Sequence, residues 1–180
     1  MRYRLLILVI SLQVIALMAT IIQHELGLSG GQEILLETAP VDPRDLLRGD
    51  YVILNYFFSG IAESQFQPPL DSPPKAGLPV YVALKSDGTV HGLSRVSLQP
   101  LTVSPDEILL RGEVDHRHPW RSGVPIKYGL ERFYVHEGTG NPTGKLTVRA
   151  RVSSRGRAQI VDVLVDGVPY SQGMKSQRKL

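Results

Sequence analysis

The chain has 180 residues, and its hydrophobic content of 42% is enough for one domain with a buried core. It contains no cysteine, which excludes disulfides, cysteine nucleophiles and zinc sites with cysteine ligands. The formal charge of +3 comes from the two ends of the chain. Without Arg2, Arg4, Lys175, Arg178 and Lys179, 15 basic residues remain against 17 acidic ones. We therefore expect no nucleic-acid partner, because such a partner requires a basic surface.

Residues 5–22 are apolar, interrupted only by Ser11, Gln13 and Thr20. As a helix this run would span roughly 27 Å, close to the hydrocarbon thickness of a bilayer. Arg2 and Arg4 precede it, which favours an amino terminus in the cytoplasm and a body outside it. The sequence therefore predicts a single-pass, uncleaved anchor in the membrane.

Two other interpretations of this run remain open. A cleaved signal peptide would have its best site after Ala19, but Leu17, two residues earlier, is not small. A soluble protein could instead bury the helix on all sides. The length of the run and the poor cleavage site favour the anchor.

The rest of the chain alternates short apolar strands with Gly and Pro turns. Strands are predicted at residues 32–38, 51–58, 79–85, 89–93, 108–114, 126–135, 145–152 and 157–165. This pattern predicts an all-β fold, an antiparallel sandwich or small barrel, after one transmembrane helix. The predicted parts are an anchor (1–24), a spacer (25–31), an extracytoplasmic β-domain (32–170) and a disordered tail (171–180).

One motif combines a turn with a strand. Pro43 restricts φ, Gly49 accepts positive φ, and Asp50 can accept hydrogen bonds from nearby backbone N–H groups. The strand that follows places Leu54 and Tyr56 on one face. The motif fits G-D-Y-x-x-L-x-Y at every specified position: Gly49, Asp50, Tyr51, Leu54 and Tyr56.

Residues 127–140 carry a second motif, Lys-Tyr-Gly-Leu-Glu-Arg-Phe-Tyr-Val-His-Glu-Gly-Thr-Gly. With the first motif it resembles the GDYXXLXY family of bacterial membrane-anchored proteins, in which proline commonly precedes the glutamate that corresponds to Glu137. Here His136 stands at that place, and residues 141–144 lack the further acidic residue that the family commonly has. The resemblance implies a place in the plasma membrane and envelope, often beside polytopic membrane proteins, and no established activity or cofactor.

Three functions follow as hypotheses. The first is a non-enzymatic β-domain at the membrane that binds a protein partner. The second is a ligand-binding or hydrolytic protein that uses Arg44, Asp50, Glu131 and Glu137 in a cleft. The third is a structural spacer in the envelope.

The acid Glu131 is predicted to lie mid-strand among apolar residues, where a carboxylate needs a partner or a raised pKa. Arg44 and Arg48, in the first motif, are the predicted partners. An ion pair there would tie the two motifs together, whereas an unpaired carboxylate would indicate a functional acid. The ion pair is the favoured alternative.

Two further patterns are weak. His116 and His118 would lie on one side of an extended chain, as metal ligands often do, but no third ligand is fixed and we expect no metal site. Residues 46–52 are similar to a segment of type I signal peptidases. The serine nucleophile of those enzymes has no counterpart, because residues 41–47 contain no serine.

Overall fold

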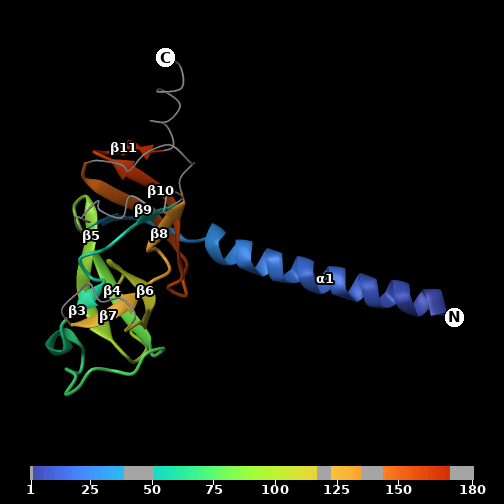
Figure 1. The fold of residues 1–180 in the computed structure, drawn as a ribbon, viewed down its shortest axis with the longest axis horizontal. Coiled ribbons are helices and arrows are strands. Elements are labelled where there is room, and N and C mark those ends of the chain that lie inside the picture. Colours follow the sequence, from blue (N-terminus) through green and yellow to red (C-terminus); the bar gives the residue numbers. More distant parts are fainter. Residues whose placement is uncertain (1, 39–50, 117–122, 135–143, 171–180) are drawn as a thin grey trace, which may run out of the picture.

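A computed structural model describes residues 2–38, 51–116, 123–134 and 144–170 of the chain. It consists of one amino-terminal helix and a body of antiparallel sheets (Figure 1). The predicted all-β body is therefore confirmed. Arg44, Arg48, Gly49, Asp50, Glu137 and His118 lie outside the described residues, as does the expected disordered tail.

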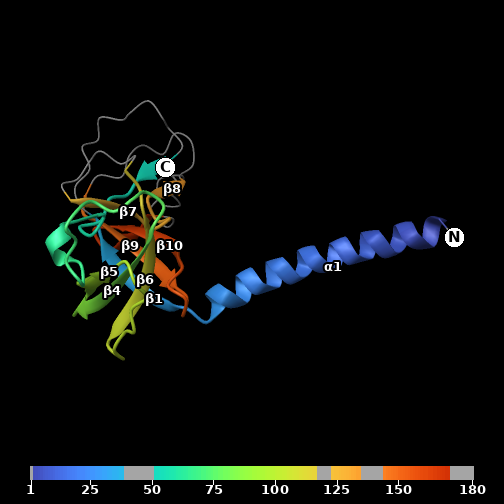
Figure 2. The ribbon, with the colours of Figure 1, turned by 90° about the horizontal axis from the view of Figure 1, so that it is seen from below.

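Helix α1 (Arg2–Ser29) is longer than the apolar run that predicted it, and it continues through most of the expected spacer. It points away from the body in both ribbon views (Figures 1 and 2). Within the described residues, no helix combines the length and the hydropathy that crossing a membrane requires.

Two sheets form most of the body. One has the order β1-β9-β10-β11 and the other the order β3-β7-β6-β4-β5, and all their named pairings are antiparallel. The first sheet contains β1 (Gln32–Glu37), β9 (Leu146–Val152), β10 (Ala158–Val165) and β11 (Val168–Pro169). The second contains β3 (Gly60–Ile61), β4 (Pro79–Asp87), β5 (Val90–Ser97), β6 (Glu107–Val114) and β7 (Val124–Lys127). A short 3-10 helix, η1 (Glu63–Gln65), follows β3.

The two sheets share one hydrophobic core. Strand β9 shows how the sequence builds it, because Val148, Ala150 and Val152 are buried at alternate positions. Residues of β4, β6 and β7 belong to the same cluster. The edge strands β1 and β5 also lie against each other. The described body is therefore an antiparallel sandwich.

Two predicted strands are wrong in their extent. The strand expected at 51–58 is β2 (Tyr51–Ile53) alone, and Tyr56 pairs with Thr38 only through an isolated bridge. The strand expected at 126–135 is broken into β7 and β8 (Arg132–Tyr134). A turn separates the two halves, in which Gly129 has φ +82°. Such a φ favours glycine and takes the chain out of the strand.

Candidate functional site

The two sequence motifs meet in space, as we expected. Strands β2 and β8 pair in a small antiparallel ribbon with Tyr51 opposite Tyr134. Just beyond β2, the Leu54 amide donates to the Glu131 carbonyl at 2.8 Å. We call the two contacting segments, residues 51–58 and 127–134, the signature junction. It joins parts of the chain that lie far apart in sequence.

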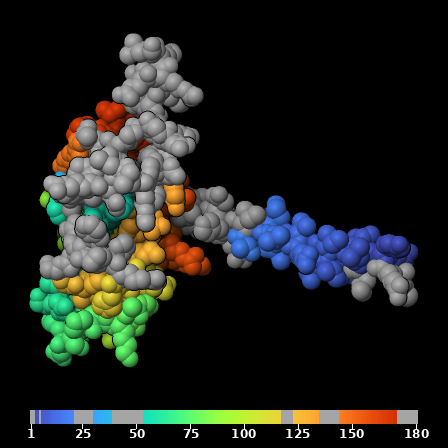
Figure 3. Space-filling view, in the orientation of Figure 1, coloured from blue at the N-terminus to red at the C-terminus, as the bar shows by residue number. Residues whose placement is uncertain are grey.

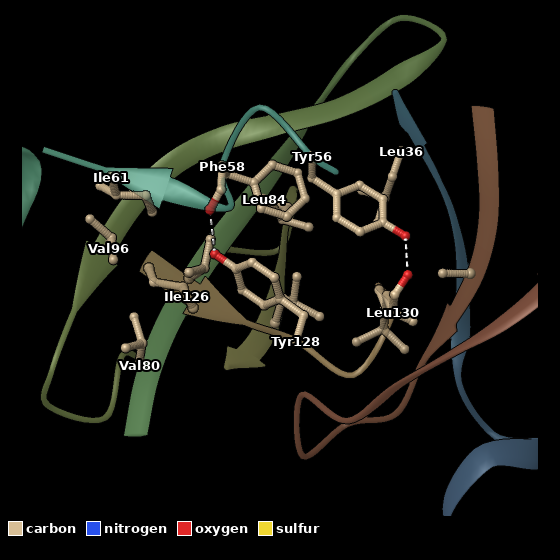
Figure 4. Close-up of a cluster of buried hydrophobic side chains, with 14 of the residues drawn as sticks. Leu36, Tyr56, Phe58, Ile61, Val80, Leu84, Val96, Ile126, Tyr128 and Leu130 are labelled. Atoms are coloured by element: carbon tan, nitrogen blue, oxygen red, sulfur yellow. Dashed lines mark hydrogen bonds between the residues drawn. The ribbon is translucent and has the colours of Figure 1, made fainter. Parts of the chain in front are cut away.

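Two buried tyrosines, one from each segment, form hydrogen bonds across the signature junction (Figure 4). The hydroxyl of Tyr56 donates to the Leu130 carbonyl at 2.7 Å. In return, the hydroxyl of Tyr128 donates to the Phe58 carbonyl, also at 2.7 Å. Each segment therefore satisfies a backbone carbonyl of the other, and a buried carbonyl without such a donor would cost free energy.

The rings of the same residues pack together. Tyr56 stacks on Phe58 with centroids 5.5 Å apart, and Phe58 meets Tyr128 edge to face at 5.2 Å. Leu54, Tyr56 and Leu130 each have 0% of their surface exposed. Such aromatic pairs add to the stabilisation that comes from burial alone. The centre of the junction is thus filled with side chains.

A glycine in the neighbouring strand makes room for this cluster. A Cβ on Gly112 of β6 would fall 2.6 Å from Ile126 Cγ2 and 2.9 Å from the Tyr128 ring. Any other residue would displace the ring. Glycine inside a strand often marks such a close approach, so the sequence contained a signal for the Tyr128 site that our reading missed.

Both hydroxyls are held in the protonated form. Burial raises the pKa of Tyr56 well above its usual value, and the nearby charge of Glu131 raises it further. Burial likewise raises the pKa of Tyr128, with Glu131 again adding to the shift. Neither phenol can serve as a general base near neutral pH, because neither loses its proton there.

The position of Glu131 differs from the expected one. It lies at the turn between β7 and β8, half-buried rather than in the middle of a strand. Its carboxylate accepts hydrogen bonds from the Tyr128 amide and from the Gly129 amide, the latter at 3.0 and 3.2 Å. The carboxylate thus holds the turn that breaks the predicted strand. Pairing with Arg44 or Arg48 stays a prediction, because both arginines lie outside the described residues.

Of the two candidate metal ligands, His116 and His118, only His116 lies within the described residues. His116 Nε2 lies 2.8 Å from the Pro74 carbonyl oxygen, which fixes the ring against a neighbouring loop. The described part of the chain contains no group of three or more side chains suited to hold a metal ion.

The outer face of the first sheet carries ion pairs between oppositely charged side chains. Lys145 lies 2.9 Å from Glu37, and Arg151 lies 2.6 Å from Glu33. Both acids come from β1, which is antiparallel to β9. Cross-strand pairs of opposite charge stabilise such a sheet modestly.

The comparison with protein families decides the identification. A model described as GDYXXLXY protein matches residues 13–163, which include both halves of the signature junction. The chain belongs to the GDYXXLXY family. No curated protein and no solved structure shows a significant match.

Proposed function

We propose that this GDYXXLXY protein is a β-domain held at the extracytoplasmic side of a bacterial plasma membrane, and that α1 is its anchor. The observation that carries the proposal is the exposure of α1. Its large apolar side chains from Tyr3 to Met18 are between 45% and 81% exposed. The helix stands clear of the body in the space-filling view (Figure 3).

These exposed side chains surround the helix. Leu6, Ile7, Leu8, Val9 and Ile10 are consecutive, and five residues cover more than one full turn. A helix that is apolar on all sides requires an apolar environment on all sides. The apolar run of the sequence also continues to Ile22, past the residues whose side chains are described. A bilayer supplies such an environment.

The proposed role of the body is to bind or support a protein partner at this membrane, not to catalyse a reaction. Its support is the state of the signature junction, which is a filled core with protonated tyrosines. The Glu131 carboxylate is already occupied by backbone N–H groups. No described feature specifically favours the hydrolytic alternative with Arg44, Asp50 and Glu137.

The anchor is tested with the full chain carrying a reporter after Leu180 that is active only when exported. We expect reporter activity and retention of the protein in membranes after washing at alkaline pH. Replacing Ile10 and Val14 by arginine should release the protein from membranes, since each charge at the centre of a span costs roughly 2.5–3.5 kcal/mol. The matched control replaces both residues by leucine and should stay in membranes. Release of the unaltered chain by the wash would overturn the proposal.

The partner is tested by cross-linking the full chain in its own membranes and identifying the captured proteins. We expect one reproducible polytopic partner, whose capture is lost when Phe57, an exposed aromatic beside the buried Tyr56, becomes alanine. A chain that captures no reproducible protein would favour the structural spacer.

A further inference from the structure

The turn between β9 and β10, residues 153–157, lies beside the base of α1. Strand β1 begins at Gln32, which pairs with Val152, and Val152 pairs in turn with Ala158. A Cβ on Gly31 would fall 2.8 Å from the Val152 carbonyl oxygen, so the chain leaving α1 touches β9 just before the turn. Both ribbon views show this hairpin next to the end of α1 (Figures 1 and 2).

The 153–157 turn is held firmly to the body. Ser153 closes it, because its amide donates to the Arg157 carbonyl at 2.8 Å and its hydroxyl accepts from the Arg157 amide at 3.1 Å. At the tip, Gly156 has φ +79° and its carbonyl accepts from the Arg111 amide of β6 at 2.8 Å. The second sheet therefore fixes how the turn presents its side chains.

The turn carries positive charge toward solvent. Arg155 and Arg157 are exposed, and neither has an ion pair within the described residues. The nearby Arg151 is matched by Glu33. Together, Arg151, Arg155, Arg157 and Glu33 carry a net charge of +2.

We propose that the 153–157 turn binds anionic phospholipid headgroups of the membrane that holds α1, and so fixes the orientation of the body on the bilayer. This inference rests on the proposed anchor. If α1 crosses the bilayer, its carboxyl-terminal end lies at the headgroup level, and the turn beside it lies there too. Guanidinium groups form two parallel hydrogen bonds with a phosphate. Each basic residue near an anionic surface should favour the bound orientation by about fivefold.

The test uses the full chain reconstituted in vesicles. Because the chain has no cysteine, a single fluorophore can be attached at Ser154→Cys in the turn. A second version carries it at Ser64→Cys in η1, on the side of the body away from α1 (Figures 1 and 2). Energy transfer to an acceptor on the headgroups reports how close each label is. Vesicles are made from phosphatidylcholine alone or with phosphatidylglycerol.

We expect the Ser154 label to come close to the headgroups only when phosphatidylglycerol is present, and the Ser64 label to stay distant in both. Replacing Arg155 and Arg157 by glutamine should abolish the difference between the two lipids. The matched control replaces two other exposed residues, Lys75 and Lys127, by glutamine and should keep it. Equal transfer at Ser154 in both lipids, or equal loss in the control, would overturn the inference and leave the turn free for an acidic protein partner.

Flotation with the vesicles after an alkaline wash reports insertion of α1 separately. A chain that fails to float would overturn the anchor and this inference with it. A chain that floats but keeps the Ser154 label away from anionic headgroups would overturn this inference alone.

Discussion

The signature junction and the outer face of the first sheet both join segments far apart in sequence, but by opposite means. At the junction, Tyr56 and Tyr128 are buried and donate to backbone carbonyls of the facing segment. On the outer face, Glu33 and Arg151 meet across strands with side chains 47% and 39% exposed. Removing one partner costs the most free energy when the remaining group is buried. When the remaining group is exposed, water solvates it and the cost is small.

This difference explains which residues the family motif specifies. The Tyr-x-x-Leu-x-Tyr part of the motif places Leu54 and the second tyrosine, Tyr56, in the filled centre of the junction. The residue between Tyr56 and Phe58, Phe57, is 59% exposed. The described part of the first motif therefore serves the fold.

The largest effect is expected from Leu54→Ala at the centre of the junction. It removes a fully buried side chain and should lower the free energy of unfolding by about 2–5 kcal/mol, from lost transfer energy and the cavity that remains. Denaturant unfolding of the full chain in detergent, followed by near-ultraviolet circular dichroism, measures it. The neighbouring Phe57→Ala is the control and should change stability by no more than about 0.5 kcal/mol. Similar losses in both would mean that the junction is not a core.

The hydroxyl groups of Tyr56 and Tyr128 should each contribute less to the free energy of unfolding than the Leu54 side chain does. Tyr56→Phe or Tyr128→Phe keeps the ring but leaves a buried carbonyl without its donor, which should cost about 1–3 kcal/mol. Because both rings contact Phe58, the double variant should depart from additivity. Tyr81→Phe in β4 is the control, since within the described residues its hydroxyl makes no hydrogen bond. If both variants lost no more stability than Tyr81→Phe does, the two tyrosine hydrogen bonds would not stabilise the junction.

Glu131 tests whether the acid of the junction is structural. Glu131→Ala removes the acceptor for two amides and should cost about 1.5–3 kcal/mol, whereas Glu131→Gln keeps an acceptor oxygen and should cost less. The cycles with Arg44→Met and Arg48→Met measure the ion pair that we predicted, and coupling in either would support it. Additive effects in both cycles would exclude that pair. Equal losses from alanine and glutamine would show that the negative charge itself is needed.

The sequence predicted the elements in which a single periodicity operates. Strand β9 alternates between core and solvent from Leu146 to Val152, and its expected limits differ from the observed ones by one residue. The break between β7 and β8 was missed because Tyr128 and Leu130 continue the apolar alternation straight through the turn. Both side chains are buried, but they are held by the hydrogen bonds of Glu131 and by the contact with Phe58. The alternation of apolar residues cannot distinguish a side chain that is buried in a strand from one that is buried at a turn.

The candidate site was predicted only in part for a related reason. The meeting of the two motifs was predicted from the need of Glu131 for a partner such as Arg44 or Arg48, but the atoms that join the motifs in the structure depend on other tertiary contacts. Gly112 and Phe58 are in neither motif, yet one makes room for Tyr128 and the other accepts its hydrogen bond. The ion pair between Arg151 of β9 and Glu33 of β1 could not be predicted from the sequence, because the two residues are 118 positions apart.

The pH dependence of stability that comes from the second sheet should be a smaller effect than the losses expected at the junction. Arg95 and hydrogen bonds from the Ser104 amide and the Ser94 hydroxyl lower the pKa of Glu107 to about 2. A carboxylate with a depressed pKa stabilises the fold above its usual pKa near 4.5, and that contribution is lost as the pH falls from there toward 2. Thermal melts between pH 6 and pH 3 should thus depend less on pH in Glu107→Gln than in the parent. Glu113→Gln, at an exposed position of the same strand, is the control and should behave as the parent does.

The smallest effect is expected for the ion pair between Glu33 and Arg151 on the outer face. Both side chains are well exposed, so solvent screens their attraction, and the pair should contribute roughly 0.2–1 kcal/mol. A double-mutant cycle with Glu33→Gln and Arg151→Gln isolates this coupling, which should shrink as salt is added. Coupling as large as the losses at the tyrosines would break the comparison between a buried junction and a solvated face. It would also mean that the end of β9 beside α1 is shielded from water in the full chain. In detergent, the shielding layer would be the micelle around α1, and repeating the cycle in vesicles would show whether a bilayer does the same.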